Sequence, residues 1–157
     1  MRVTKAEEYG LRLVMSLAVD GGQLSIRELA DREGLPEPTV AKVIAKLRKA
    51  GVVDAERGRN GGYQLSVAPG ELTLARVVEA FDETMFDAEF CDRMTPGSGP
   101  CARADRCTLR PVWRSLSDVV ATFLDGITIA DVMRRTEPSP IPITTTTDVT
   151  AHLGSSN

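Results

Sequence analysis

Apolar residues recur every three to four positions near the start of the chain, with polar and charged residues between them. The spacing of Leu13, Val14 and Leu17 predicts an amphipathic helix over residues 4–19, because such positions share one helical face. Asp20-Gly21-Gly22 ends this helix, since glycine is common just beyond a helix C-terminus. The chain therefore begins with a helix that buries one side.

The next two apolar patterns predict a pair of short helices. Ser25 followed by Glu28 forms a capping-box pattern, which places a helix start at Ser25, and Gly34 ends that helix. Pro38 suits the first position of the following helix, which extends toward Gly51. The buried stripe of this helix is formed by Val40, Val43, Ile44 and Leu47. Two short helices joined by a glycine-containing turn predict a helix-turn-helix.

A glycine-rich turn between two short apolar segments follows the helix-turn-helix. Residues 52–53 and 63–65 predict two strands, and Arg57-Gly58-Arg59-Asn60-Gly61-Gly62 predicts the turn that joins them. A β-hairpin in this place is a wing. The predicted fold is therefore mainly α, a winged helix-turn-helix with a small β wing.

Three further helical patterns, a cysteine-bearing loop and a polar tail make up the rest of the chain, and the last of the three predicts a short helix over residues 127–135. Apolar spacing predicts a helix over residues 72–81 and a long C-terminal helix from residue 108. The long helix carries a candidate dimerisation stripe formed by Leu109, Val112, Leu116, Val119, Val120 and Phe123. We divide the chain into a DNA-binding domain over residues 1–67, a cluster-binding loop with dimerisation helices over 68–135, and a disordered tail over 136–157.

The bulk composition is that of an ordinary globular protein. Hydrophobic residues make up 42% and charged residues 26% of the chain, values typical of soluble domains. No apolar run approaches the roughly 20 residues that cross a bilayer, and the first residues have no signal-peptide pattern. We therefore expect a cytoplasmic protein without membrane contact. In that reducing compartment, clustered cysteines are metal ligands or redox sensors more often than structural disulfides.

Charge is unevenly distributed, although the net charge is only −3. Between Glu37 and Gly62, six basic residues outnumber three acidic ones, whereas from Ala68 onward eight basic residues accompany 13 acidic ones. DNA phosphates attract only the basic part. The predicted DNA-binding residues are Thr39, Lys42, Lys46 and Lys49 on the third helix and Arg57 and Arg59 on the wing. The sequence thus predicts a reader of double-stranded DNA joined to an acidic second part.

All three cysteines, Cys91, Cys101 and Cys107, lie in one segment rich in Gly and Pro. Such a segment favours a loop over a helix or strand. Iron in sulfide clusters prefers thiolate ligands, so three cysteines on a loop can bind three corners of a cubic cluster and leave the fourth open. Zinc held by three thiolates and one carboxylate is an alternative, as is a metal-free thiol switch. No catalytic histidine, acid-base pair or glycine-rich cofactor loop indicates an enzyme.

The start of the chain, the end of the helix-turn-helix and the wing together resemble the Rrf2 family of winged-helix transcriptional regulators over residues 1–135. The matching segments are Met1-Arg2-Val3-Thr4, Tyr9-Gly10-Leu11-Arg12, Leu47-Arg48-Lys49-Ala50-Gly51-Val52-Val53 and Arg57-Gly58-Arg59-Asn60-Gly61-Gly62-Tyr63, followed by the three cysteines. The resemblance implies a homodimer that binds a palindromic promoter site. It also implies one iron–sulfur cluster per subunit, [4Fe-4S] rather than [2Fe-2S], whose state changes DNA binding.

The resemblance assigns roles to single residues as well. The three cysteines match the cluster ligands, Thr39 and Lys42 fall in the recognition helix, and Arg57 matches the wing arginine. The iron–sulfur-assembly branch of the family (IscR) has a histidine where this chain has Arg110. In the nitric-oxide-sensing branch (NsrR), a carboxylate that reaches across the dimer completes the cluster, and the matching position is Glu8. The adjacent Glu7 is the alternative fourth ligand.

The sequence therefore predicts a dimeric repressor whose iron–sulfur cluster senses nitric oxide, closest in its features to the NsrR branch. A regulator that senses iron–sulfur supply, oxygen or redox state is the alternative within the same family. A zinc-binding or thiol-switch winged-helix regulator is the alternative outside the cluster-binding members.

Overall fold

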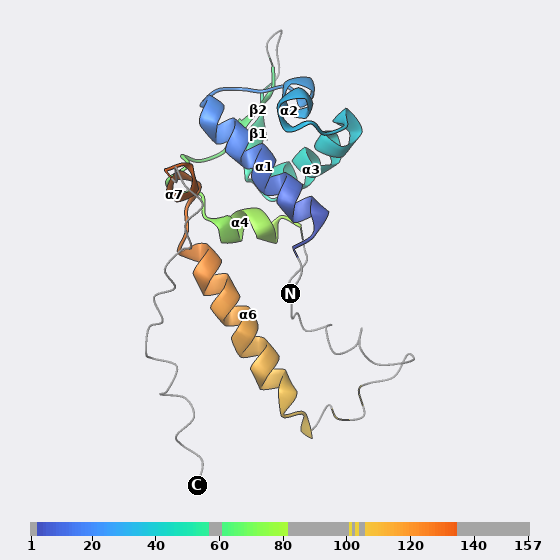
Figure 1. The fold of residues 1–157 in the computed structure, drawn as a ribbon, viewed down its shortest axis with the longest axis vertical. Coiled ribbons are helices and arrows are strands. Elements are labelled where there is room, and N and C mark those ends of the chain that lie inside the picture. Colours follow the sequence, from blue (N-terminus) through green and yellow to red (C-terminus); the bar gives the residue numbers. More distant parts are fainter. Residues whose placement is uncertain (1–2, 57–60, 82–100, 102, 104–105, 135–157) are drawn as a thin grey trace.

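The computed structural model of the chain describes residues 3–56, 61–81, 101, 103 and 106–134. In chain order the elements are α1 (Lys5–Asp20), α2 (Ile26–Glu33), α3 (Glu37–Lys49), β1 (Val53–Ala55), β2 (Tyr63–Leu65), α4 (Leu74–Glu79), α6 (Leu109–Asp125) and α7 (Ile129–Met133). Figure 1 shows α1, α2, α3 and the strands gathered at one end, with α6 projecting from the other side of α4. The predicted winged helix-turn-helix with a small β wing is confirmed.

Capping boxes start three of the described helices. In each, a hydroxyl accepts a backbone N–H and a carboxylate three residues later accepts the N–H of the cap residue. The pairs are Thr4 with Glu7 at α1, Ser25 with Glu28 at α2, and Thr128 with Asp131 at α7. The predicted start at Ser25 is confirmed. Gly21 and Gly34 end α1 and α2 in the left-handed conformation, which glycine adopts at little cost.

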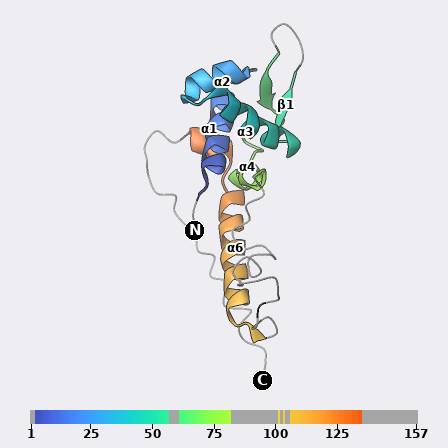
Figure 2. The same ribbon diagram turned by 90° about the vertical axis from the view of Figure 1, so that its right-hand side faces the viewer.

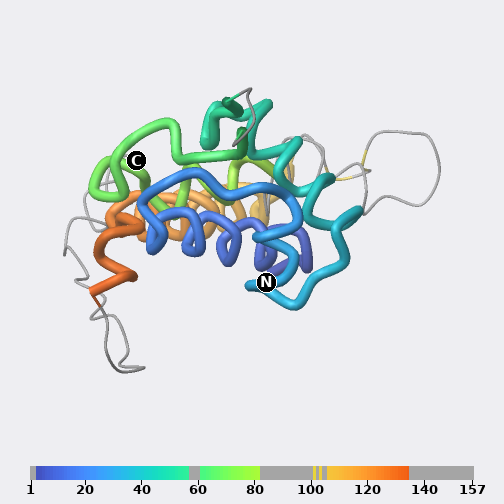
Figure 3. The backbone as a smooth tube through the Cα atoms, turned by 90° about the horizontal axis from the view of Figure 1, so that it is seen from above, coloured from blue at the N-terminus to red at the C-terminus, as the bar shows by residue number. Residues whose placement is uncertain are grey.

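One hydrophobic core joins the helix-turn-helix to α4 and α7. All four residues of the predicted α3 stripe are buried in it. Leu72, Phe81 and Ile129 belong to the same core although they follow the domain boundary predicted at residue 67. The core therefore extends across that boundary, and α7 packs near the C-terminal end of α1 (Figures 1 and 3).

The wing is an antiparallel pair in which Val53, Asp54 and Ala55 face Leu65, Gln64 and Tyr63. The backbone of Tyr63 also exchanges two hydrogen bonds with Leu24, at 2.8 and 3.0 Å. Gly62 allows this approach, because a Cβ there would lie 2.9 Å from backbone atoms of Leu24. The hairpin is thus fixed to the loop ahead of α2. Arg57 and Arg59, at the predicted wing turn, lie outside the described residues.

Helix α4 is shorter than the predicted 72–81 because Thr73 caps it, its hydroxyl accepting the backbone N–H of Arg76. The backbone of the α4 start is bonded to the α6–α7 connection, where Leu74 donates to the carbonyl of Ile127 at 2.8 Å. Helix α6 begins as predicted but has no buried residue in the single chain, and Figure 2 shows it extending away from α2 and α3.

None of the described helices combines the length and the apolar character needed to cross a bilayer. The predicted disordered tail, residues 136–157, lies outside the described residues.

Candidate nucleic-acid interface and metal ligands

The side of α3 opposite its buried stripe presents Lys42 and Lys49 to solvent. Among the described residues, no carboxylate forms an ion pair with either lysine. The basic residues of the last turn, Lys46, Arg48 and Lys49, lie at the negative end of the helix dipole, which favours positive charge there. This side of α3 can therefore offer unpaired ammonium groups to a polyanion.

The other two residues of the predicted DNA face differ from these lysines in their surroundings. Thr39 is half-buried. The Nζ atom of Lys46 lies 5.6 Å from the centre of the Phe81 ring, within cation–π range. The predicted face thus contains three exposed lysines, one of which contacts an aromatic ring, and one half-buried threonine. As DNA contacts, all four remain predictions.

The C-terminal end of α3 is held by two side chains that converge on one carbonyl. The carbonyl of Gly51 accepts a hydrogen bond from Arg76 Nη2 at 3.0 Å and one from Ser66 Oγ at 2.6 Å. Gly51 itself has a φ of 68°, a conformation that favours glycine. Sequence reasoning did not identify Arg76, because a hydrogen bond to a distant backbone carbonyl has no periodic signature.

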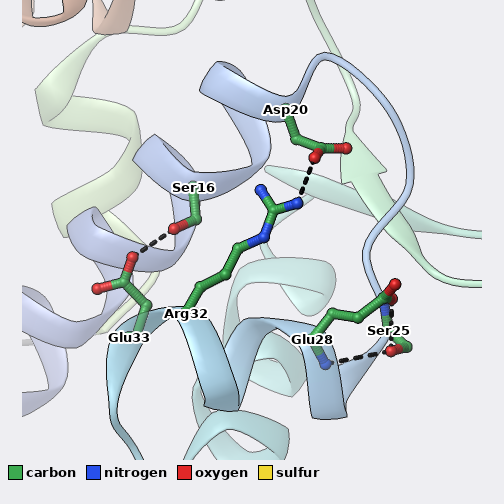
Figure 4. A network of polar contacts seen from close by, with 6 residues as sticks. All are labelled: Ser16, Asp20, Ser25, Glu28, Arg32 and Glu33. Atoms are coloured by element: carbon green, nitrogen blue, oxygen red, sulfur yellow. Dashed lines mark hydrogen bonds and ion pairs between the residues drawn. The ribbon is translucent and has the colours of Figure 1, made fainter.

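A polar network fixes α1 to the end of α2. Arg12 Nε donates to Glu33 Oε2 at 2.8 Å, and Arg12 Nη2 donates to the backbone carbonyl of Glu33 at 2.5 Å. The hydroxyl of Ser16 donates to the other carboxylate oxygen of Glu33. Figure 4 shows this contact beside a second link between the two helices, from Arg32 to Asp20. Helix α2, the first helix of the helix-turn-helix, is therefore fixed to α1.

The structure describes two of the three predicted cysteine ligands. Cys101 and Cys107 are half-buried free thiols just before α6, and Cys91 lies outside the described residues. Four exposed arginines, which sequence reasoning did not single out as a group, belong to this stretch of the sequence and the start of α6: Arg103, Arg106, Arg110 and Arg114. The described cysteines thus lie beside positive charge, within a part of the chain that is acidic on average.

The two candidate carboxylates differ sharply in their surroundings. Glu7 is 7% exposed, and its carboxylate accepts the backbone N–H of Thr4 at 2.7 Å in the α1 capping box. Glu8 is exposed. A carboxylate committed to a cap is a poor candidate for a metal, so the geometry favours Glu8. The signal for Glu7 was present in the sequence as the Thr4-to-Glu7 spacing, the same pattern that marked Ser25 and Glu28.

The predicted ligands that the structure describes, which do not include Cys91, form no metal site within one chain. Among the described residues, no three His, Cys, Asp or Glu side chains lie close enough to hold a metal ion. Figures 1 and 2 place the beginning of α1 and the beginning of α6 well apart. Glu8 and Cys107 lie at these two helix starts, so they can share a site only if they come from different chains or if the chain rearranges.

Comparison with known proteins agrees with this architecture. A family model described as "Rrf2: Iron-dependent Transcriptional regulator" matches residues 3–135. The HTH-type transcriptional regulator IscR of Aliivibrio salmonicida is 32% identical over 135 residues, which cover 85% of this chain and 77% of that protein. The IscR of Cronobacter sakazakii is 30% identical over 139 residues, covering 87% and 83% respectively.

Comparison with solved structures supports the same fold. The chain is similar to T. potens IscR with a TM-score of 0.66 and 28% identity, over 90% of this chain and 92% of the other. It is also similar to CymR (YrzC), described as the global cysteine regulator of B. subtilis, with a TM-score of 0.68 and 23% identity over 87% and 99%. The second likeness concerns the fold alone.

Proposed function

Because the chain belongs to the Rrf2 family and is therefore a DNA-binding transcriptional regulator rather than an enzyme, we propose that an iron–sulfur cluster controls its binding to DNA. The observation that carries this proposal is the pair of free, half-buried thiols of Cys101 and Cys107 directly ahead of α6. Cys91 belongs to the same segment and supplies a third thiolate. The family description, an iron-dependent regulator, agrees with iron as the metal.

The donor set fits an iron–sulfur cluster. Three thiolates bind three irons of a [4Fe-4S] cluster, and an exposed carboxylate can bind the fourth. Glu8 is accessible for that role, whereas Glu7 is held in the α1 cap. When bound, the cluster supplies a redox-active group that oxygen or nitric oxide can degrade or modify. The residues of this chain hold it, and α1 connects Glu8 to the helix-turn-helix through Arg12 and Glu33.

The exposed apolar stripe of α6 is the basis for proposing a dimer. Leu109, Val112, Leu116 and Val119 are between 41% and 57% exposed in the single chain. An apolar stripe of this kind at helical spacing packs against the same stripe of a second copy. The dimer would place two recognition helices on the two halves of a palindromic operator. It also provides the second chain from which Glu8 of the partner subunit can reach the cysteines.

The signal we propose is the supply or redox state of the cluster, and nitric oxide is the second candidate. Sequence reasoning placed nitric oxide first, but the matching regulators of Aliivibrio and Cronobacter carry the name IscR, the assembly branch. Two observations support nitric oxide as the second candidate signal. Arg110 replaces the histidine of the assembly branch, and Glu8 is free to act as a ligand that is displaced more easily than a thiolate.

Purification without oxygen tests the proposal. We expect a brown protein with iron and sulfide, and loss of its colour in each variant Cys91→Ala, Cys101→Ala and Cys107→Ala, with Ser115→Ala as an unaffected control. Affinity for a promoter fragment is then compared before and after cluster removal. Colourless, iron-free protein that binds the fragment with unchanged affinity contradicts the proposal, and stoichiometric zinc supports the zinc alternative.

A second experiment distinguishes nitric oxide from cluster supply as the signal. Nitric oxide is added to the anaerobic protein, and DNA affinity is measured again. A change in affinity with nitric oxide, but not with limited iron supply, supports nitric oxide as the signal. The reverse result supports the sensing of cluster supply.

A further inference from the structure

The ring of Phe81 is enclosed between α1 and α3. Its side chain is 1% exposed. On one side lies Gly10 of α1, where a Cβ would be 2.4 Å from two ring carbons. The ring also contacts Lys46 of the recognition helix, whose Nζ atom lies 5.6 Å from the ring centre. Phe81 therefore connects the fixed first helix to one basic side chain of α3.

Helix α4 contacts the recognition helix at a second point. Arg76 donates to the carbonyl of Gly51, just beyond the C-terminus of α3. Phe81 follows α4 by two residues, so the same short segment contacts the last turn of α3 and the residue just beyond its end. These two contacts join the C-terminal end of α3 to α4 and the residue that follows it.

We propose that Phe81 is a positioning residue for DNA binding, which holds Lys46 in place for a contact with a DNA phosphate. A free lysine side chain samples many rotamers, and fixing it on binding costs entropy. The negative face of an aromatic ring attracts the ammonium group and leaves its other N–H donors free. Lys46 is therefore arranged before DNA arrives, whereas Lys42, one turn earlier, has no such ring among the described residues.

This arrangement connects the cysteine-bearing segment to the recognition helix. Phe81 precedes Cys91 by ten residues, and α4 is bonded at its start to the α6–α7 connection. A change that displaced Phe81 would free Lys46 and weaken DNA binding. This regulatory part rests on the proposed function, but the positioning of Lys46 requires only DNA binding.

A double-mutant cycle tests the positioning. Affinity for a promoter fragment is measured over a range of salt for wild type, Phe81→Leu, Lys46→Gln and the double variant. Lys46→Gln should weaken binding and reduce the salt slope by about 0.9, the value for one phosphate contact. Phe81→Leu should weaken binding about two- to fivefold and have no further effect once Lys46 is replaced.

The matched control is the pair Phe81→Leu and Lys42→Gln, whose effects should simply combine. Lys46→Arg keeps a cation above the ring, so Phe81→Leu should still weaken that variant. Thermal unfolding monitors the fold, and Phe81→Met, which fills the space without a ring, replaces Phe81→Leu if the latter unfolds. An equal effect of the Phe81 substitution with and without Lys46, or unchanged binding by Lys46→Gln, overturns the proposal.

The two hypotheses fail in different ways. If cluster removal leaves DNA affinity unchanged while the Phe81–Lys46 cycle shows coupling, the sensing function is wrong and the positioning role stands. If cluster removal alters affinity but the cycle is additive, the sensing function stands and Phe81 has no positioning role.

Discussion

Gly10 of α1 lies directly against the ring of Phe81. A Cβ at position 10 would come within 2.4 Å of two ring carbons, far inside van der Waals contact. The ring is fully buried and belongs to the hydrophobic core. A glycine in the middle of a helix, normally unfavourable, is here the condition for packing α4 on α1.

Gly10→Ala should therefore destabilise the protein. Alanine gains roughly 0.5–1 kcal/mol in helix propensity, but overpacking a core costs about 1–3 kcal/mol. A clash this short belongs at the upper end of that range. Thermal unfolding should show a lower midpoint than wild type. Gly70→Ala, where no atom lies within 4 Å, is the matched control. A higher midpoint for Gly10→Ala would contradict the packing described.

Glu33→Gln should loosen the contact between α1 and α2. It removes the charge that accepts hydrogen bonds from Arg12 and Ser16. Because the Arg12 side chain is 39% exposed, solvent screens the pair, and we expect a loss of about 1 kcal/mol in the free energy of unfolding. Urea titration measures it. Asp20→Asn breaks the more exposed Arg32 pair and should cost less. Equal losses would argue against a special role for Glu33.

Two capping carboxylates should make the stability depend on pH. Hydrogen bonds from the side chain and backbone of Ser25 lower the pKa of Glu28, and those of Thr128 lower the pKa of Asp131. A carboxyl whose pKa is lower in the folded state stabilises the fold above its unfolded pKa. This stabilisation is lost as the pH falls from about 5 through the folded pKa.

The unfolding midpoint should therefore fall on acidification, and less steeply in a Glu28→Gln and Asp131→Asn double variant. Both substitutions keep an oxygen acceptor but cannot titrate. A double variant with the same pH profile as wild type would assign the acid sensitivity to other groups.

Leu116→Glu should disrupt the dimer that we propose. The residue lies in the exposed apolar stripe of α6, and a charge buried in a dimer seam is strongly unfavourable. Sedimentation should show monomers, with weakened operator binding. Ala121→Glu adds the same charge to an exposed position on the opposite side of α6 and should leave the assembly intact. If Leu116→Glu remains dimeric, the dimer interface lies on another surface.

Glu8→Gln and Glu7→Ala should give opposite results. Glu8 is exposed, so its replacement should change the absorbance of the cluster or its reaction with nitric oxide without changing the unfolding midpoint. Glu7→Ala removes the capping contact with Thr4 and should cost about 0.5–2 kcal/mol of stability while leaving the cluster unchanged. Reversed results would make Glu7 the ligand.

Local patterns predicted the fold well because its helices begin and end at local signals. Ser25, Glu28 and Gly34 mark α2 unaided, and the α3 stripe is wholly buried as its spacing implied. The wing strands were predicted from the turn between them. The Thr4-to-Glu7 spacing is an equally clear capping signal, and it is sufficient to distinguish Glu7 from Glu8.

The contacts that join elements were not predictable in the same way. In the sequence, Lys46 has the same helical spacing as Lys42 and Lys49, so nothing distinguishes it from them. Its contact with the ring of Phe81 arises only when the segment after α4 packs against α3. Arg76 binds a backbone carbonyl, which any sequence offers. Arg57, Arg59 and Cys91 lie outside the described residues, and their roles remain predictions.

The double hydrogen bond between Leu24 and Tyr63 has a consequence for operator choice. It attaches the β2 end of the hairpin to the segment that leads into α2, so this end cannot move independently of the helix-turn-helix. In the predicted mode of DNA binding, the hairpin and α3 would therefore contact a promoter as two regions at a preset separation. A base change that shifts the duplex under one region also disturbs the other, and the energetic effects of such changes will be correlated along the site.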